Sequence, residues 1–213
     1  MWRLHLTALS KIARAVLVLA VVHVAGMLGA PASVADTVNK LAVTHYQQNE
    51  SNWCGPTALQ VVVKKLTGTY KTQCNYYRDE RGLASTAPCP NNTATTTQVR
   101  TGLGANVSHS GVWRGDALTW ADVKDNIKAA HPMIAYLRLP IDDRAEHVDG
   151  YHFMTLYGYE VDGDTHYIYY SNFPVVTGTG TSARKDKVKM SVYRAKDRNH
   201  GFIVENTLIN IHD

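Results

Sequence analysis

The sequence is best suited to chemistry where a cysteine opens a predicted helix and a glutamine lies six positions before it. Gln48 is followed by Asn-Glu-Ser-Asn-Trp and then by Cys54. The thiolate is the reactive form of cysteine, and a helix N-terminus favours it through unpaired N–H groups and the positive end of the dipole. A nearby side-chain amide can help the backbone N–H of the cysteine to stabilise a developing oxyanion. The spacing predicts a nucleophile at Cys54 and an oxyanion donor at Gln48.

A cysteine nucleophile needs a base, and the base needs an orienting group. His152 opens an apolar stretch typical of a strand, and Asn172 ends the next predicted strand. Counted from the turn at residues 162–164, the two lie about ten and about eight residues away, as adjacent strands require. Taken alone, His152 is also typical of a core or surface histidine, and Asn172 is also typical of a turn residue. Their order after Gln48 and Cys54 favours His152 as base and Asn172 as orienter, with His147 as the alternative base.

The Cys54 segment reads as a helix over residues 52–66. Apolar side chains recur at three- and four-residue steps and predict one buried face. Pro56 is tolerated in the first turn, Gly68 predicts the end of the helix, and Lys64 and Lys65 suit the negative end of the dipole. The residues of the expected buried face are Ala58, Leu59, Val62, Val63 and Leu66.

The remaining pattern is helices first and strands afterwards. A short strand is expected at 41–46 and short helices over 95–103 and from Thr119, where Thr-Trp-Ala-Asp forms a capping box. Trp120, Val123, Ile127 and Ala130 are expected on the inner face of the second of these helices, and Pro132 ends it. Strands follow at 133–139, 151–161, 166–171, 188–193 and 202–211, with a hairpin turn at Asp162-Gly163. This layout predicts an α+β fold with an antiparallel sheet.

Two of the three cysteines bracket a polar loop over residues 70–92. Cys74 and Cys89 are 15 positions apart. Export to an oxidising compartment favours a disulfide between them, worth on the order of 3 kcal/mol. Cys54 then remains as a free thiol, either reactive or buried and inert.

The first 35 residues have the composition of a secretory signal peptide. A basic start with Arg3, Lys11 and Arg14 precedes an apolar run, and small-x-small sites allow cleavage after Ala32 or Ala35. Removal leaves 178 residues with 19 basic and 18 acidic side chains, which suits one domain over 36–213. We expect a secreted protein without stable membrane association after cleavage. The near-neutral mature charge does not indicate a nucleic-acid partner.

The sequence does not indicate a metal or another cofactor. The three cysteines form no C-x-x-C pair, and His147 and His152 lack the spacing of a zinc helix. Asp162-Gly163-Asp164 is more typical of a solvated turn than of a calcium loop.

Three segments together resemble the papain-like cysteine peptidases of family thirty-nine, which includes the double-glycine leader peptidases. These segments are 48–59, 118–139 and 150–174, and the resemblance covers roughly residues 44–174. It implies a papain-like fold, with the nucleophile helix packed on the sheet. Carried over, the family roles fall on Gln48, Cys54, His152 and Asn172. Two departures are the Asn at a position where many relatives carry Asp-Pro, and the absence of an exporter domain.

The expected activity is hydrolysis of peptide bonds in a peptide or protein substrate through a Cys-His-Asn mechanism. Two alternatives remain. One is a non-catalytic secreted binding protein on the same scaffold, and the other is a transglutaminase-like acyl transferase, which also uses a cysteine followed by a histidine and an acidic or amide residue.

Overall fold

A computed structural model of the chain describes residues 37–115, 118–139, 150–172, 184–194 and 203–213. All of them belong to one unit, residues 35–213. Several expectations lie outside the described residues. These are the signal peptide over 1–35, the alternative base His147, and the segment after Asn172 with Phe173 and Pro174.

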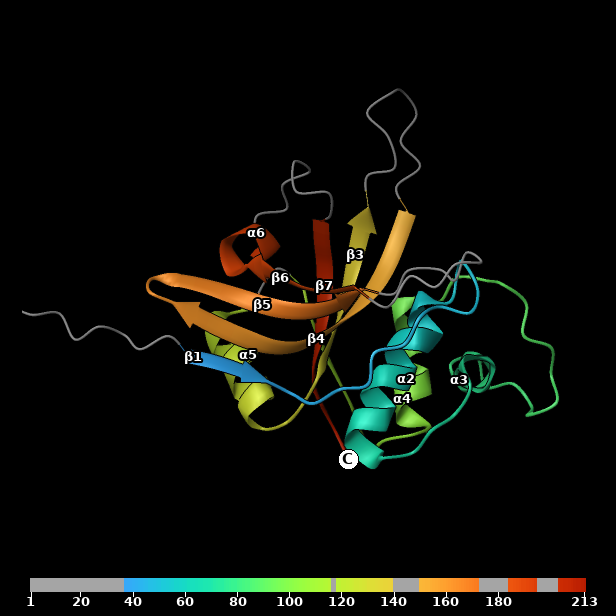
Figure 1. The fold of residues 1–213 in the computed structure, drawn as a ribbon. Coiled ribbons are helices and arrows are strands. Elements are labelled where there is room, and N and C mark those ends of the chain that lie inside the picture. The colour runs from blue at the N-terminus through green and yellow to red at the C-terminus, as the bar shows by residue number, and fades with distance from the viewer. Residues whose placement is uncertain (1–36, 116–117, 140–149, 173–183, 195–202) are drawn as a thin grey trace, which may run out of the picture. The chain divides into compact units, whose positions relative to one another are not determined.

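An antiparallel sheet of seven strands forms the centre of the fold (Figure 1). Its order is β2-β7-β3-β4-β5-β6, and β1 pairs with the second half of β4, beyond the reach of β3. All pairs are antiparallel, which confirms the predicted α+β class. The strands are β1 Thr37–Lys40, β2 His109–Arg114, β3 Met133–Leu139, β4 Gly150–Asp162, β5 Thr165–Asn172, β6 Arg184–Lys189 and β7 Ile203–His212.

The hairpin of β4 and β5 brings the two candidate site residues of the sheet together. Asp162 pairs with Thr165 around a two-residue turn, and Gly163 takes a φ of 53° there, a conformation that favours glycine. A register shift between Leu156 and Gly158 inserts one extra residue into β4. The shift accounts for part of the unequal count from the turn to His152 and to Asn172, and the predicted hairpin is confirmed.

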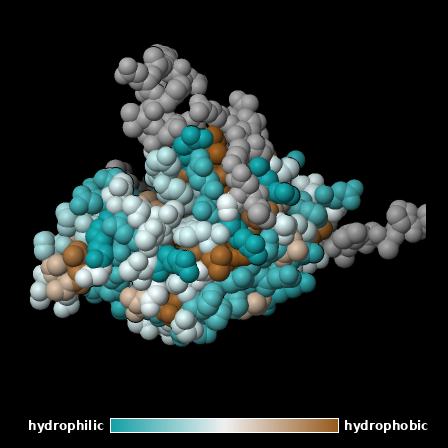
Figure 2. Space-filling model, turned by 180° about the vertical axis from the view of Figure 1, so that it is seen from behind, coloured by the Kyte–Doolittle hydropathy of each residue, from teal (hydrophilic) through white to brown (hydrophobic). Residues whose placement is uncertain are grey.

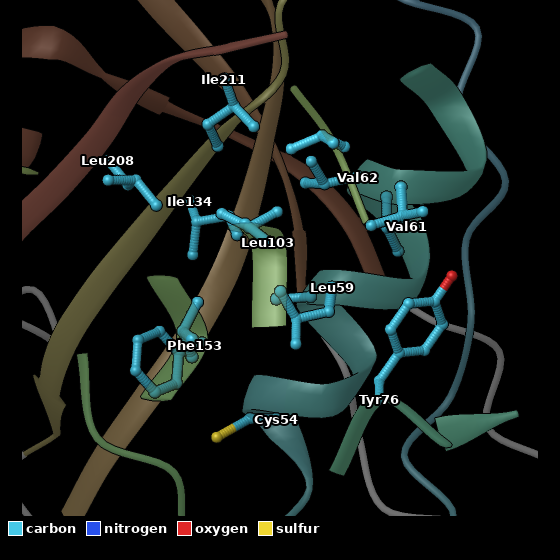
Figure 3. Packing of buried hydrophobic residues seen from close by; sticks show 14 residues of the cluster. Cys54, Leu59, Val61, Val62, Tyr76, Leu103, Ile134, Phe153, Leu208 and Ile211 are labelled. Atoms are coloured by element: carbon cyan, nitrogen blue, oxygen red, sulfur yellow. The ribbon is translucent and has the colours of Figure 1, made fainter. Parts of the chain in front are cut away.

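Helices cover both faces of the sheet, and each face has its own core. α2 contacts β4, and α4 contacts β2 and α2. Their cluster joins Cys54 and Leu59 to Phe153 and Leu208, as Figure 3 shows. α5 and α6 lie over a second cluster that includes Met154, Leu156 and Ile168. The helices are α2 Cys54–Thr67, α3 Gln73–Asp79, α4 Thr96–Gly104, α5 Trp120–Lys128 and α6 Met190–Arg194.

The Cys54 helix is more deeply buried than its sequence pattern predicts. Its first ten residues, Cys54 to Val63, are all buried, because α3 and α4 pack against the side of α2 that does not meet β4. Gly68 ends the helix in the left-handed conformation, and its N–H donates to the carbonyl of Lys64. The expected single apolar face is therefore part of an almost wholly buried first half, which holds Cys54 in a fixed position.

Four sequence predictions need correction. Residues 41–46 form no strand, and the strand of this region is β1, four residues earlier. The loop over 70–92 contains α3, capped by the Thr72 hydroxyl. The strand expected at 188–193 is the end of β6 followed by α6, in which Met190 and Tyr193 are buried at helical spacing. Ala130 lies beyond the end of α5 and is exposed, so it is not part of the inner face.

The surface and the helices were both compared with what a membrane protein requires. Figure 2, seen from behind, shows a mostly hydrophilic surface on which apolar residues form small separate groups. Among the described residues, none of the helices has the length and apolar content needed to cross a membrane.

Candidate active site

Cys54 is the first residue of α2, and its thiol lies at the junction of the helix and β4. The side chain is 6% exposed, and Cys54 is a free cysteine. Figure 3 shows its sulfur directed away from the helix on the side of the strands. Trp53, at the N-cap position, makes no side-chain capping hydrogen bond. The helix therefore presents the backbone N–H groups of its first turn around the cysteine.

Burial and backbone hydrogen bonds act in opposite directions on the Cys54 thiol. Desolvation is the largest cause and outweighs the backbone hydrogen bonds from Phe153, Gly55 and Cys54 itself, so that the pKa of the thiol is raised to about 11. A buried thiol with so high a pKa rests in the protonated form at neutral pH. Thiolate chemistry at this position therefore depends on a base that accepts the proton during the reaction.

His152 and Asn172 form a hydrogen-bonded pair across β4 and β5. The Nε2 atom of His152 lies 2.8 Å from Oδ1 of Asn172. An amide oxygen only accepts, so Nε2 carries the hydrogen and Nδ1 is left as the proton acceptor. Burial lowers the pKa of His152, and the bond to Asn172 acts against this shift. The ring therefore rests as the neutral tautomer that a general base requires.

The thiol and the imidazole belong to neighbouring positions of the fold. Phe153, which directly follows His152, hydrogen-bonds the thiol through its backbone. Met154 and Leu156, which alternate with His152, pack in the second cluster, away from α2. Among the described residues, no hydrogen bond joins the thiol to the His152 ring. The structure thus places the Cys54 thiol beside the backbone of β4 at Phe153, whereas the alternation of side chains along β4 puts His152 on the face of Met154 and Leu156. Transfer of the thiol proton to His152 therefore requires a rearrangement at the start of β4.

Gln48 is buried near the start of α2, but its amide hydrogens are already engaged. Its side chain is 2% exposed, and Nε2 donates to the carbonyls of Glu50 and Ser51, each at 3.1 Å. The Oε1 atom is buried and has no hydrogen-bond partner. The opposite amide orientation would face two carbonyls with a third oxygen. In this state Gln48 stabilises the turn before Cys54, and donating to an oxyanion requires exchange of one of these bonds.

A second layer of polar residues, which the sequence did not single out, supports the turn. Gln73, 2% exposed, donates to the carbonyl of Gln47 at 2.6 Å and accepts from the backbone N–H of Asn49 at 2.9 Å. Asn91 accepts from the N–H of Asn52, and the Trp53 indole donates to the carbonyl of Pro90. Residues near both ends of the Cys74–Cys89 disulfide thus hold the turn. In the sequence, the one feature that indicates this role for Gln73 is its place directly before Cys74.

The described residues contain no group of three His, Cys, Asp or Glu side chains arranged to hold a metal ion. The chemistry available at this position is that of a thiol, an imidazole, two amides and the backbone of a helix N-terminus.

Comparison with known proteins gives the class of the chain. Residues 40–198 match the model of the Peptidase_C39 like family, a stretch that contains Gln48, Cys54, His152 and Asn172. The match covers most of the chain, and the protein belongs to the Peptidase_C39 like family. Membership indicates a peptidase-like hydrolase. A search of curated proteins finds no match to the chain.

Proposed function

We propose that this protein is a secreted cysteine peptidase of papain-like architecture that hydrolyses peptide bonds with Cys54 as nucleophile and His152 as base. The observation that carries the proposal is the 2.8 Å bond from His152 Nε2 to Asn172 Oδ1. It leaves Nδ1 as the proton acceptor, one residue away from the position whose backbone contacts the thiol. Family membership supports the same class of reaction.

The mechanism begins with transfer of the Cys54 thiol proton to Nδ1 of His152. The sulfur attacks the carbonyl carbon of the scissile peptide bond, and the carbonyl oxygen becomes an oxyanion. The Cys54 backbone N–H and one Gln48 N–H bind this oxyanion, the latter after leaving the carbonyl of Glu50 or Ser51. The tetrahedral adduct collapses, the C–N bond breaks, and the imidazolium protonates the leaving amine. Water, deprotonated by His152, then hydrolyses the thioester and regenerates the thiol.

Asn172 acts as an orienter in this scheme. By accepting from Nε2–H, it holds the ring in the tautomer whose Nδ1 can receive a proton. Its neutral amide adds no full charge, so it stabilises the imidazolium less than a carboxylate would. This is the physical consequence of the asparagine at a position where many members of the resembled family carry aspartate.

The proposal includes export and one domain over 36–213 after removal of residues 1–35. The disulfide between Cys74 and Cys89 supports it, because such bonds persist in oxidising compartments. N-terminal sequencing of the exported protein should begin at Ser33 or Asp36. An exported or membrane-bound form that retains Met1 would contradict cleavage.

A non-catalytic binding protein is the second candidate, favoured by the raised thiol pKa and by the lack of a described bond between Cys54 and His152. Incubation of the mature protein with a mixed peptide library separates the possibilities. New termini that vanish in Cys54→Ala support a peptidase. Ammonia release with incorporation of an added amine selects an acyl transferase, and peptide retention without either product selects the binding protein.

A further inference from the structure

Two stacked tyrosines lie on the sheet face that carries the Cys54 thiol. We propose that Tyr136 and Tyr151 form a substrate-binding surface that receives an aromatic or other large apolar side chain of the peptide beside the scissile bond. The inference rests on the proposed peptidase function and names the substrate class of that site.

The ring geometry is that of a continuous aromatic surface. The centroids of Tyr136 and Tyr151 are 5.2 Å apart with an angle of 6° between planes, and Tyr136 also meets Phe153 at 4.9 Å. Tyr136 pairs with Phe153 in the β3–β4 register. Tyr151 and Phe153 alternate along β4, so their side chains share one face. The three rings therefore follow one another along the face on which α2 packs.

This surface begins at the thiol. The backbone of Phe153 hydrogen-bonds Cys54, and Phe153 belongs to the same core cluster as Cys54. The pKa of Tyr136 is raised mainly by burial, and also by electrostatic interaction with the nearby ionisable groups of Tyr151, Glu205 and Cys54. A peptide whose carbonyl carbon lies over the sulfur therefore has a neighbouring side chain within reach of the tyrosine rings.

The exposure of the Tyr151 ring is not explained by packing against the core. Tyr136 is half-buried and packs against the core, whereas Tyr151 is 55% exposed. Tyr151 also immediately precedes the proposed base His152. Stacking on Tyr136 fixes the orientation of the exposed ring before a ligand arrives, so less side-chain freedom is lost on binding. A substrate ring would extend the existing stack.

The charges next to the rings are paired with each other. Arg138 Nε lies 3.0 Å from Glu205 Oε1, and both side chains are about one-third exposed. This pairing leaves little net charge at the edge of the aromatic surface. Recognition at this position therefore falls on ring surfaces, which favour apolar and aromatic side chains over acidic or basic ones.

The test compares a peptide series that varies one position at a time on both sides of the scissile bond. Wild-type protein should prefer Phe, Tyr or Leu at one of these positions over Gly or Asp. In Tyr151→Ala the KM for the preferred peptide should rise about 3- to 10-fold with kcat nearly unchanged, as loss of one aromatic contact implies. Tyr151→Phe should keep the preference. Tyr70→Ala is the matched control, since Tyr70 is 61% exposed beyond the far end of α2.

An equilibrium measurement separates this inference from the proposed function. In Cys54→Ala, which cannot react, the same peptides should bind more weakly when Tyr151 is also replaced by Ala. If wild-type protein cleaves no peptide but this binding difference is present, the peptidase proposal fails and the binding surface stands. If peptides are cleaved and Tyr151→Ala behaves like Tyr70→Ala, the binding surface is wrong and the peptidase proposal stands. If the protein shows neither cleavage nor binding that depends on Tyr151, both the peptidase proposal and the binding surface are wrong.

Discussion

His152 Nε2 donates to Asn172 Oδ1 across 2.8 Å, from the first part of β4 to the last residue of β5. The bond exists because the β4–β5 hairpin turns at Gly163 and returns Asn172 beside the start of β4. It fixes which imidazole nitrogen can accept a proton.

Replacing Asn172 by Asp should move the pH dependence of activity. A carboxylate beside the imidazole favours its charged form, so the pKa of His152 should rise from its lowered value. The acid limb of kcat/KM against pH should therefore move to higher pH in Asn172→Asp. Asn172→Ala should lower kcat by about tenfold, less than loss of the base itself. An unchanged pH profile in Asn172→Asp would show that residue 172 does not act on the base.

Replacing His152 by Ala should remove nearly all turnover, because nucleophile and base act as a unit. His45→Ala is a matched control, since His45 is a partly buried histidine that bonds Ser171, the neighbour of Asn172, at 2.9 Å. It should keep activity within a few-fold of wild type. Turnover that disappears in His147→Ala while His152→Ala remains near wild type would assign the base to His147.

Replacing Gln48 by Ala should lower both activity and stability. Loss of one oxyanion donor costs on the order of 10²-fold in kcat. Loss of the bonds to Glu50 and Ser51 costs about 1 kcal/mol each in the free energy of unfolding. Kinetics and urea unfolding of the same variant measure the two effects. Reduced stability with unchanged kcat would show that Gln48 only supports the turn.

The free energy of unfolding should fall as the pH is lowered, because His45 binds a proton at a higher pH in the unfolded chain than in the folded protein. Burial, with a smaller contribution from Lys185, lowers the pKa of His45 from 6.5 to about 4. Because the folded pKa is the lower one, the loss begins near pH 6.5 and is complete near pH 4. His45→Asn should flatten the urea-unfolding free energy over this range. An identical pH dependence in the variant would contradict this origin.

The disulfide should stabilise the fold and leave one free thiol. Thiol counting on the unreduced protein should find Cys54 alone. The Cys74→Ser/Cys89→Ser variant should lose on the order of 3 kcal/mol in the free energy of unfolding. Because residues near this bridge hold the turn before Cys54, its kcat should fall as well. A variant of unchanged stability would show that the bridge constrains little.

The sequence pattern was sufficient to predict a helix or strand where the residues of that element themselves indicate its type and its ends. The bounds of β3 were predicted without error, since an apolar run follows Pro132, and the Thr119 capping box marked the start of α5. β2 was missed because only Gly111 is buried in it, and its identity depends on pairing with β7, about a hundred residues away. α3 was missed because Tyr76 and Tyr77 are its only large apolar residues.

The site divides in the same way. The order of Gln48, Cys54, His152 and Asn172 and the hairpin count predicted that the last two meet, and they do. The direction of the Gln48 amide depends on two carbonyls within its own turn, which spacing does not encode. The support from Gln73 depends on how α3 packs, and α3 itself was not foreseen. Contacts that depend on tertiary packing were thus beyond the reach of sequence pattern.

The central claim is that His152 activates the Cys54 thiol, and the rate of alkylation by iodoacetamide tests it most directly. Cys54 in the native, unreduced protein should be alkylated near neutral pH, with the modified residue identified by mass spectrometry. In His152→Ala the rate should fall at least about tenfold and recover only as the pH approaches 11, the range set by burial of the thiol. Equal rates in the two proteins across this pH range would contradict the claim.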